Sequence, residues 1–229
     1  MATLNVISSM ASREVLKELA ARFQKRHGHT IQLEAIGGVE AAKRVRADEA
    51  FDAVVLAKNV IEALAGEGKV LEGSIRDIAQ SGISVAVRQG APRSDISTEE
   101  AVRKAVMAAP SLSYSTGPSG VYLEKKFAAW GELENLRPRI VVPPPGTPVA
   151  SLVAAGKAAI GFQQLSELIH VPGIEVLGAL PGGMQLMTTF SGATAATSKQ
   201  QQLVQSLLDF MASAETAEVK VTFGMEACP

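Results

Sequence analysis

Hydrophobic and polar residues along the chain follow two spacings in turn, one typical of buried strands and one typical of amphipathic helices. Short apolar runs at 4–7 and 53–57 predict buried strands, and apolar residues alternate with polar ones over 30–36. Over 13–26, by contrast, apolar side chains recur at helical spacing, which predicts an amphipathic helix. Because strand and helix signals alternate, we predict an α/β protein whose mainly parallel sheet is covered by helices.

The same alternation continues along the rest of the chain. Further strands are predicted at 83–88, 113–115, 139–142, 159–164, 174–177 and 185–191. Further helices are predicted at 39–49, 59–66, 97–108, 120–130 and 147–156, and in the region that runs to Gly224.

Two helix starts and one strand end are predicted from specific residues. Ser97 with Glu100 has the spacing of a capping box, which makes Ser97 the expected N-cap. Thr147 followed by Pro148 has the pattern of an N-cap with proline at the first helical position. The run Pro143–Gly146 is expected to stop the strand before it.

The domain organisation is predicted to be two lobes without a flexible tether. No repeat, low-complexity stretch or charge run marks a linker, so paired strands are expected to join the lobes, near 81–90 and 181–192. The predicted lobe 1 is discontinuous and comprises 1–82 and 190–229, and the predicted lobe 2 is 83–189.

Composition and charge narrow the function. The chain carries 22 Lys and Arg against 23 Asp and Glu, a net charge of −1, which argues against nucleic-acid binding. The single cysteine, Cys228, has no internal partner, and no Cys/His cluster has zinc spacing, so neither a bound metal nor a cofactor is expected. No apolar run approaches the roughly 20 residues of a membrane span.

Four junctions between a strand or turn and a helix share small or hydroxyl residues. Helix N-termini offer unpaired N–H groups, and ligands bind at the carboxyl ends of strands in open α/β sheets, so these junctions predict an anion held by neutral donors. The alternative is ordinary helix capping by the same residue types. The candidate ligand-binding residues are Ser8, Ser9, Met10, Gly38, Val39, Ser115, Ser119, Gly120, Val121, Thr147, Pro148 and Val149.

The run 161–167 places two amides and a carboxylate beyond a buried strand. Because successive strand residues point to opposite faces, only one of Gln163 and Gln164 is expected to face a ligand. Glu167 is either a general base or ligand contact, or a cap of backbone N–H groups. Lys58, after the strand 53–57, is either a surface lysine or a site residue, and Tyr122 either reaches the ligand or packs.

These residues resemble a known family. The chain is similar to the molybdate-binding-like family of ABC-transporter solute-binding proteins, which have the type II periplasmic-binding-protein fold. That fold has two α/β lobes joined by two crossing strands, with the ligand cleft between the lobes. The resemblance is carried by Ser8-Ser9, Gly37-Gly38 and the stretches 51–56, 90–92, 118–122, 161–164 and 223–226.

The resemblance implies the ligand contacts and the partners. In this family, serine hydroxyls and backbone amides bind an oxyanion, which implies contacts from Ser8 or Ser9, Gly38 or Val39, Ser119 and the amides at 147–149. Gln164 stands where a tyrosine often completes the site, so the implied ligand is an oxyanion or an organic carboxylate. The resemblance also implies a monomer that serves an ABC permease.

A divergent branch of the family is similar over 81–97 and 163–167, and some of its members resemble aconitate isomerase. This implies, as an alternative, a cofactor-free isomerase of a tricarboxylate whose base is Glu167, Lys58 or His170. A cytosolic ligand sensor is a third possibility. The chain enters its first strand without a signal peptide. We therefore expect a periplasmic protein if a signal peptide was removed, and a cytoplasmic one if Met1 is the natural start.

Overall fold

The computed structural model describes residues 1–144 and 146–228, and it divides into two compact units. Unit 1 combines Met1–Ser81 with the segment from Thr188 onward, and unit 2 is Gly82–Met187. The boundaries predicted from the sequence lie after residues 82 and 189. Pro145, in the predicted strand stop, lies outside the described residues.

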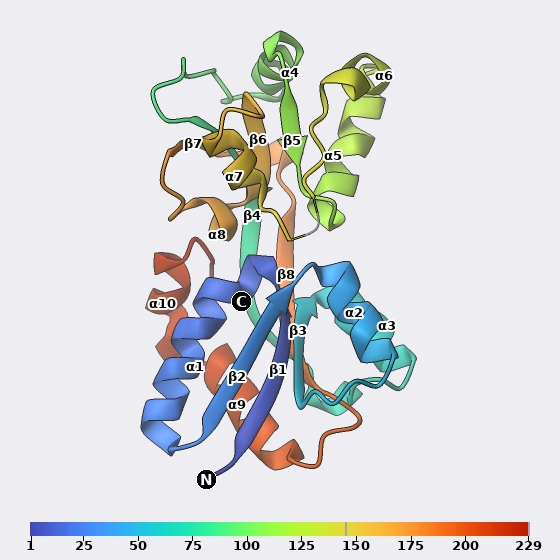
Figure 1. Cartoon of the computed structure of the whole chain (residues 1–229), viewed down its shortest axis with the longest axis vertical. Coiled ribbons are helices and arrows are strands. Elements are labelled where there is room, and N and C mark those ends of the chain that lie inside the picture. Colours follow the sequence, from blue (N-terminus) through green and yellow to red (C-terminus); the bar gives the residue numbers. More distant parts are fainter. Residues whose placement is uncertain (145, 229) are drawn as a thin grey trace. The chain divides into compact units, whose positions relative to one another are not determined.

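Unit 1 is built on a sheet whose strands lie in the order β2-β1-β3-β8-β4 (Figure 1). β1 pairs in parallel with β2 and β3, so that Ser8 lies beside both Ala35 and Val55, and β8 is antiparallel to β3. The carboxyl ends of β1, β2 and β3 therefore meet at one edge of unit 1. The strands are β1 (Thr3–Ser9), β2 (Thr30–Ile36), β3 (Ala53–Ala57), β8 (Met187–Thr194) and β4 (Arg76–Arg88).

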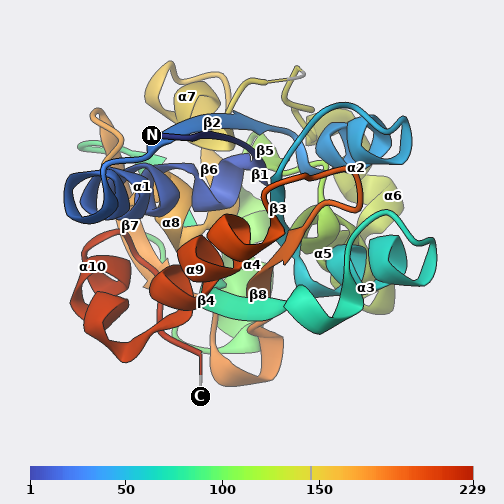
Figure 2. The same cartoon turned by 90° about the horizontal axis from the view of Figure 1, so that it is seen from below.

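Helices cover both faces of this sheet, because its central strands are apolar on both sides. Val55 of β3 belongs to the cluster formed with α1, α9 and α10, whereas Val54 belongs to the cluster formed with α2 and α3. The two groups of helices lie on opposite sides of the strands in Figure 2. Their bounds are α1 (Arg13–His27), α2 (Gly38–Arg46), α3 (Lys58–Gly66), α9 (Gln201–Ala212) and α10 (Ala217–Thr222), with short 3₁₀ turns at Met10–Ser12, Glu72–Ser74 and Ala214–Thr216.

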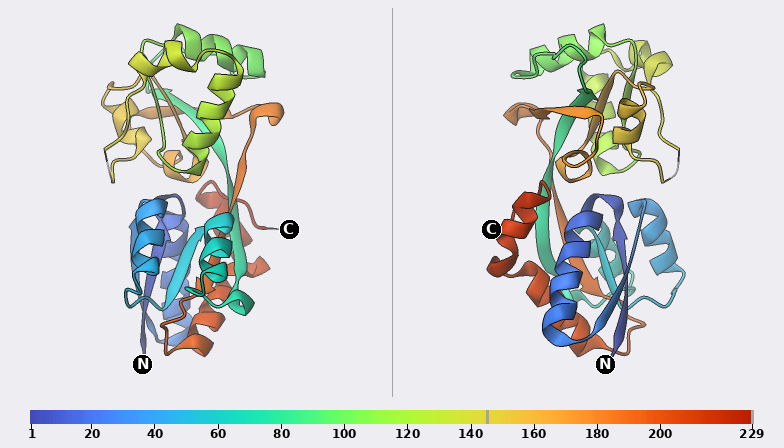
Figure 3. Two further views of the ribbon diagram at one scale, coloured as in Figure 1. Left: turned by 90° about the vertical axis from the view of Figure 1, so that its right-hand side faces the viewer. Right: turned by 60° about the vertical axis from the view of Figure 1, so that its left-hand side comes forward.

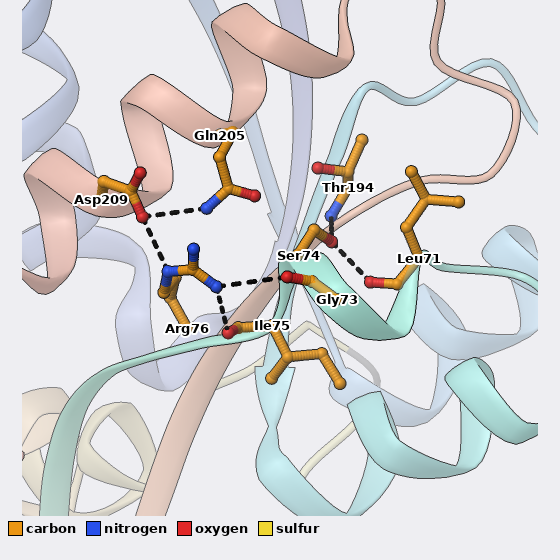
Figure 4. Close-up of polar contacts among 8 residues, drawn as sticks. All are labelled: Leu71, Gly73, Ser74, Ile75, Arg76, Thr194, Gln205 and Asp209. Carbon is orange, nitrogen blue, oxygen red and sulfur yellow. Dashed lines mark hydrogen bonds and ion pairs between the residues drawn. The ribbon is translucent and has the colours of Figure 1, made fainter.

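Polar contacts fix the start of β4 against β8 and α9 (Figure 4). The Arg76 guanidinium donates to Asp209 of α9 at 2.7 Å and to the carbonyl of Ile75 at 2.9 Å. The Ser74 hydroxyl accepts the N–H of Thr194 at 2.8 Å. β4 is therefore anchored in unit 1 before it continues into unit 2 beyond Ser81.

Unit 2 contains the second half of β4, with β6 (Ile160–Gln164) and β7 (Ile174–Ala179) antiparallel to it and β5 (Leu112–Tyr114) parallel to β6. Phe162 of β6 packs with α4 (Glu99–Ala108), α5 (Pro118–Ala129) and α6 (Leu133–Leu136). The opposite face carries α7 (Val149–Ala154) and α8 (Leu165–Leu168), and the two groups can be followed in Figure 3. Short 3₁₀ turns lie at Arg137–Arg139 and Gly182–Met184.

Two predicted helix caps are wrong by one residue. Thr98 caps α4, since its hydroxyl accepts the N–H of Ala101 at 3.1 Å, whereas the N–H of Ser97 donates to the Asp95 carboxylate. Ser97 and Thr98 both carry a hydroxyl that can cap this helix, and the path of the backbone determines which of the two does so. At α7 the N-cap is Pro148 rather than Thr147, with an extended backbone at Pro148.

One predicted strand is absent. Residues 137–139 form a 3₁₀ turn, and the segment 139–142 makes an isolated bridge, between Ile140 and Leu112, rather than a strand ladder. Prolines at 138, 143 and 144 flank the segment, and proline has no N–H to extend a strand ladder. The apolar run Ile140–Val142 therefore follows the turn as extended chain without forming a strand of the sheet.

Other elements differ in length. β4 begins at Arg76 rather than 83, because it continues through unit 1, and β8 spans 187–194 rather than 185–191. The helix predicted over 39–49 ends at Arg46. The backbone then turns through Asp48, whose positive φ of 55° is not helical.

Candidate functional site

The edge of unit 1 where β1, β2 and β3 end brings Ser9 and Gly38 together. A Cβ built on Gly38 would lie 3.8 Å from the Cβ of Ser9, so a larger residue at 38 would narrow the space beside the serine. Val39, in the first turn of α2, is 74% exposed, and Met10 follows Ser9 in a 3₁₀ turn. Of the predicted residues in unit 1, Ser9, Gly38 and Val39 are therefore neighbours at one strand edge.

The hydroxyl groups at this edge bond to one another rather than to charged groups. Ser9 Oγ lies 3.2 Å from Ser12 Oγ, and Ser12 Oγ donates to the carbonyl of Ser9 at 3.2 Å. Since each hydroxyl has one proton, Ser9 is the donor to Ser12 and can turn its proton toward an anion instead. The buried Ser8 donates to the carbonyl of Ser9 at 3.3 Å, which directs its hydroxyl back to the loop.

Lys58 begins α3, directly after β3, but it is ion-paired. Its Nζ lies 2.7 Å from Asp77 of β4, and Ser191 of β8 donates to the other Asp77 oxygen at 2.6 Å. The hydrogen bond to Asp77 raises the pKa of Lys58. Burial raises the pKa of Asp77, but the hydrogen bonds from Lys58 and Ser191 outweigh it and lower that pKa below its usual range. A protonated, paired ammonium has no lone pair with which to act as a base.

In unit 2 the loop after β5 brings Ser115 and Ser119 together. Their hydroxyl oxygens lie 2.8 Å apart, and Ser119 sits in the first turn of α5. Gly120 packs so closely that an added Cβ would overlap the carbonyl oxygen of Ser115. The N–H groups of Gly120 and Val121 donate to the carbonyl of Gly117 at 3.0 and 3.2 Å, which leaves the serine hydroxyls as the candidate donors here.

The start of α7 offers fewer donors than predicted. The N–H of Thr147 donates to the carbonyl of Pro144 at 2.9 Å, and Pro148 has no N–H. The N–H of Ala150 donates to the side chain of Gln163 at 3.1 Å. Of the backbone N–H groups predicted at 147–149, that of Val149 therefore stays a candidate donor to the ligand.

Gln163 and Gln164 point to opposite faces of β6, as predicted, and both are buried. Gln163 lies on the α7 face, where its Nε2 donates to Glu167 Oε1 at 2.8 Å. Glu167 thus accepts from a side-chain amide, not from the backbone N–H groups that one alternative expected. Burial raises the pKa of Glu167 to about 7, although the hydrogen bond from Gln163 lowers it. This carboxyl changes its charge near neutral pH.

The remaining candidates are less suited to contact a ligand. His170 is exposed and follows α8. The Tyr122 hydroxyl donates to the carbonyl of Met184 at 3.0 Å, so this tyrosine packs within unit 2.

Sequence reasoning overlooked three residues. Ser12 partners the Ser9 hydroxyl, and only its place in the same serine-rich junction could have indicated it. Ser166, beside Glu167, has a buried hydroxyl without a hydrogen-bond partner among the described residues. Asp77 holds Lys58, and nothing in its sequence surroundings predicts this pairing across strands.

Residues 1–144 and 146–228 contain neither a cluster of metal ligands nor a membrane-spanning helix. In these ranges no group of three His, Cys, Asp or Glu side chains is placed to hold a metal ion. No helix in this part of the chain has the length and hydropathy needed to span a membrane.

A family model described as bacterial extracellular solute-binding protein matches residues 4–226. The chain belongs to this family. It is also 34% identical over 235 residues to aconitate isomerase from a Pseudomonas species, a match that covers 99% of this chain and 88% of that protein.

Solved structures confirm the fold of this solute-binding protein. The periplasmic molybdate-binding protein of Azotobacter vinelandii superimposes with a TM-score of 0.81 at 17% identity, covering 99% of this chain and 100% of that one. PEB3 of Campylobacter jejuni with bound L-phospholactate gives 0.74 at 14%, covering 97% and 99%. The chain therefore has the type II periplasmic-binding-protein fold, as predicted. Membership of this family, together with these anion-binding neighbours, fits a small anionic ligand.

Proposed function

We propose that this solute-binding protein captures a small anion, either an oxyanion or an organic carboxylate, and delivers it to an ABC-type permease. The observation that carries the proposal is the set of neutral donors at strand ends in each unit, Ser9 with Gly38 and Ser115 with Ser119. Because these donors are neutral, an anion can bind to them without the cost of desolvating a positive charge on the protein. For this function we propose a periplasmic location.

The test is a thermal-shift screen against molybdate, tungstate, sulfate, phosphate and a panel of di- and tricarboxylates. An anion that binds only the folded state stabilises it by about 2.7 kcal/mol at a hundredfold excess over its dissociation constant. We expect at least one member of the panel to raise the melting temperature. If none does so at millimolar concentration, the anion-capture function is wrong.

The serine hydroxyls are expected to carry much of the affinity. Ser9→Ala and Ser119→Ala should each weaken binding of the stabilising anion by about 1–3 kcal/mol, because each removes a donor from a buried site. Titration calorimetry measures the loss. The matched control is Ser97→Ala. Ser97 is an exposed serine of unit 2 that does not cap α4, so this variant should bind the anion as tightly as the wild type does. Unchanged affinity in both site variants would remove these serines from the site.

A second candidate function is cofactor-free isomerisation of a tricarboxylate such as aconitate. Two features support it: the 34% identity to aconitate isomerase, and the burial of Glu167, which raises the pKa of its carboxyl to about 7. The Glu167 carboxylate would remove a proton from a carbon beside a carboxylate and return it to another carbon, so that atoms and charge balance. Hydroxyl and amide donors would stabilise the enolate-like oxygen.

Glu167→Gln separates catalysis from binding. If Glu167 is the base, the amide should lower the isomerisation rate by about 10²–10⁴-fold while the ligand still raises the melting temperature. The wild-type rate should rise as the pH passes through about 7, because only the carboxylate accepts a proton. Proton NMR of aconitate in D₂O measures both turnover and exchange. Full activity in the variant would exclude Glu167 as the base.

A further inference from the structure

The side chain of Gln185 holds β4 at the point where this strand enters unit 2. Gly82 is the first residue of unit 2, and the register of β4 with β7 begins at Ser84. Ile83 lies between these two residues, and there the Gln185 amide takes the place of a neighbouring strand. Its Oε1 accepts the N–H of Ile83 at 2.8 Å, and its Nε2 donates to the carbonyl of Ile83 at 3.0 Å.

The orientation of this amide is set by its neighbours. Its Oε1 also accepts the N–H of Leu186 at 2.9 Å, so two donors face the oxygen and the nitrogen must face the carbonyl of Ile83. Gly82 leaves room for the amide, because an added Cβ would lie 2.8 Å from Gln185 Nε2. Ile83 is 0% exposed, so water cannot replace the amide at its N–H. Gln185 therefore satisfies the backbone of β4 where the ladder does not.

The 3₁₀ turn directly before Gln185 is held by α5. The Tyr122 hydroxyl donates to the carbonyl of Met184 at 3.0 Å, and Lys126 Nζ donates to the carbonyl of Gly183 at 3.1 Å. Tyr122 and Lys126 have the i, i+4 spacing of one helix face. One face of α5 thus fixes two consecutive carbonyls of the turn, and with them the start of the Gln185 side chain.

The same helix carries Ser119, the candidate donor of unit 2. Ser119 and Tyr122 have the i, i+3 spacing of one helix face, and Ser119 is 6% exposed. A continuous series of contacts within unit 2 therefore leads from Ser119 along α5 to the turn and on to Ile83 of β4. The alternative is that Tyr122 and Lys126 only stabilise the turn, in which case an anion at Ser119 has no effect on Ile83.

We propose that Tyr122 and Lys126 are positioning residues through which α5 couples anion capture at Ser119 to the hold of Gln185 on β4. The coupling rests on the anion-capture function. An anion bound at Ser119 restrains the first turn of α5. A restrained helix holds the two carbonyls of the turn, and hence the Gln185 amide, more firmly in place. The N–H of Ile83 then opens less often when the anion is bound.

The first experiment needs no ligand and measures amide hydrogen exchange in the full chain. Gln185→Leu removes the acceptor of the Ile83 N–H, and we expect exchange at Ile83 to become about tenfold faster. A double variant, Tyr122→Phe with Lys126→Met, should accelerate it by about three- to tenfold, because the turn loses both side-chain donors. The amides of 85–87, which lie within the strand ladders, are the internal reference and should not change.

The matched control is Tyr114→Phe. The Tyr114 hydroxyl donates to Glu124 of α5 at 2.9 Å, so this variant removes a hydrogen bond of similar length from the same helix but not from the turn. Exchange at Ile83 should stay as in the wild type. If the double variant does not fold, Tyr122→Phe alone should give a smaller acceleration. Unchanged exchange at Ile83 in both of these variants would overturn the positioning role.

The second experiment repeats the exchange measurement with molybdate and with trans-aconitate, each at a concentration that calorimetry shows to be saturating. A bound probe should slow exchange at Ile83 by about threefold or more in the wild type. It should not do so in the double variant. Equal slowing in both proteins would overturn the coupling, because the effect of the anion would then reach β4 by another route.

The coupling and the anion-capture function fail in different ways. If a probe binds the wild type and leaves exchange at Ile83 unchanged, anion capture stands and the coupling is wrong. If neither probe binds, the coupling falls together with anion capture of these two classes, whereas the positioning of Gln185 by α5 is decided by the first experiment.

Discussion

Gly120→Ala is expected to destabilise the protein by more than about 3 kcal/mol, a large part of the stability of a typical domain. A Cβ at this position would overlap the carbonyl oxygen of Ser115 and crowd the ring of Tyr114. The obstacle is backbone, so no side-chain rotation relieves it, and the loop between β5 and α5 must move. Urea unfolding measures the loss, and the anion binding that we propose for Ser119 should weaken with it.

Gly117→Ala is the matched control in the same loop. Gly117 has a φ of −88°, which alanine adopts freely, and the nearest atom to an added Cβ is Ser115 Oγ at 3.8 Å. Alanine is a poorer N-cap than glycine, and this is the main loss that we expect. The free energy of unfolding should therefore fall by less than about 1 kcal/mol. Equal stability of the two variants would show that the loop accommodates a side chain at Gly120.

Lys220→Met is expected to stabilise the protein by about 2 kcal/mol at pH 7. The lysine is 0% exposed, and its Nζ has no hydrogen-bond partner in the described part of the chain. A buried ammonium without a partner is costly, and methionine fills a similar volume without a polar group. Burial also raises the pKa of Cys228, which keeps the nearby thiol neutral and provides no counter-charge.

The gain should depend on pH in a defined direction. Burial lowers the pKa of Lys220 in the folded state below its usual value of about 10.5. Above that value the amine is neutral in both states and imposes no charge penalty. As pH falls, the unfolded chain gains a proton that the folded chain resists, so stability is lost and the advantage of methionine grows.

Thermal unfolding of both proteins between pH 6 and 10.5 measures this difference. The control is Lys17→Met, an exposed lysine of α1, which should change stability by less than about 0.5 kcal/mol. A Lys220→Met protein that is less stable than the wild type at pH 7 would mean that the amine has a stabilising partner.

Local patterns along the chain were sufficient for most of the fold. β1 and β3 contain short apolar runs because helices cover both faces of their sheet, and such runs are visible in sequence. The helix α1 was predicted from the apolar spacing of its buried side chains and ends, as expected, before Gly28. The fold class followed from the alternation of these signals.

The predictions from sequence were wrong where two different local structures were both compatible with the residues present. Ser97 and Thr98 are both good N-caps, and the strand pattern over 139–142 competes with the prolines around it. In both places the path of the backbone in unit 2 determines which local structure forms. That path depends on contacts with residues distant in sequence.

The sequence alone determined the fold class, the positions of the strand ends and the residue types gathered there. Only the tertiary structure decided which of them meet. Strand register places Ser9 beside Gly38 and lets Asp77 neutralise Lys58, while the contact between β6 and α7 orients Gln163 toward Glu167. Pairing, burial and pKa depend on neighbours brought close by folding, and no local spacing along a chain encodes them.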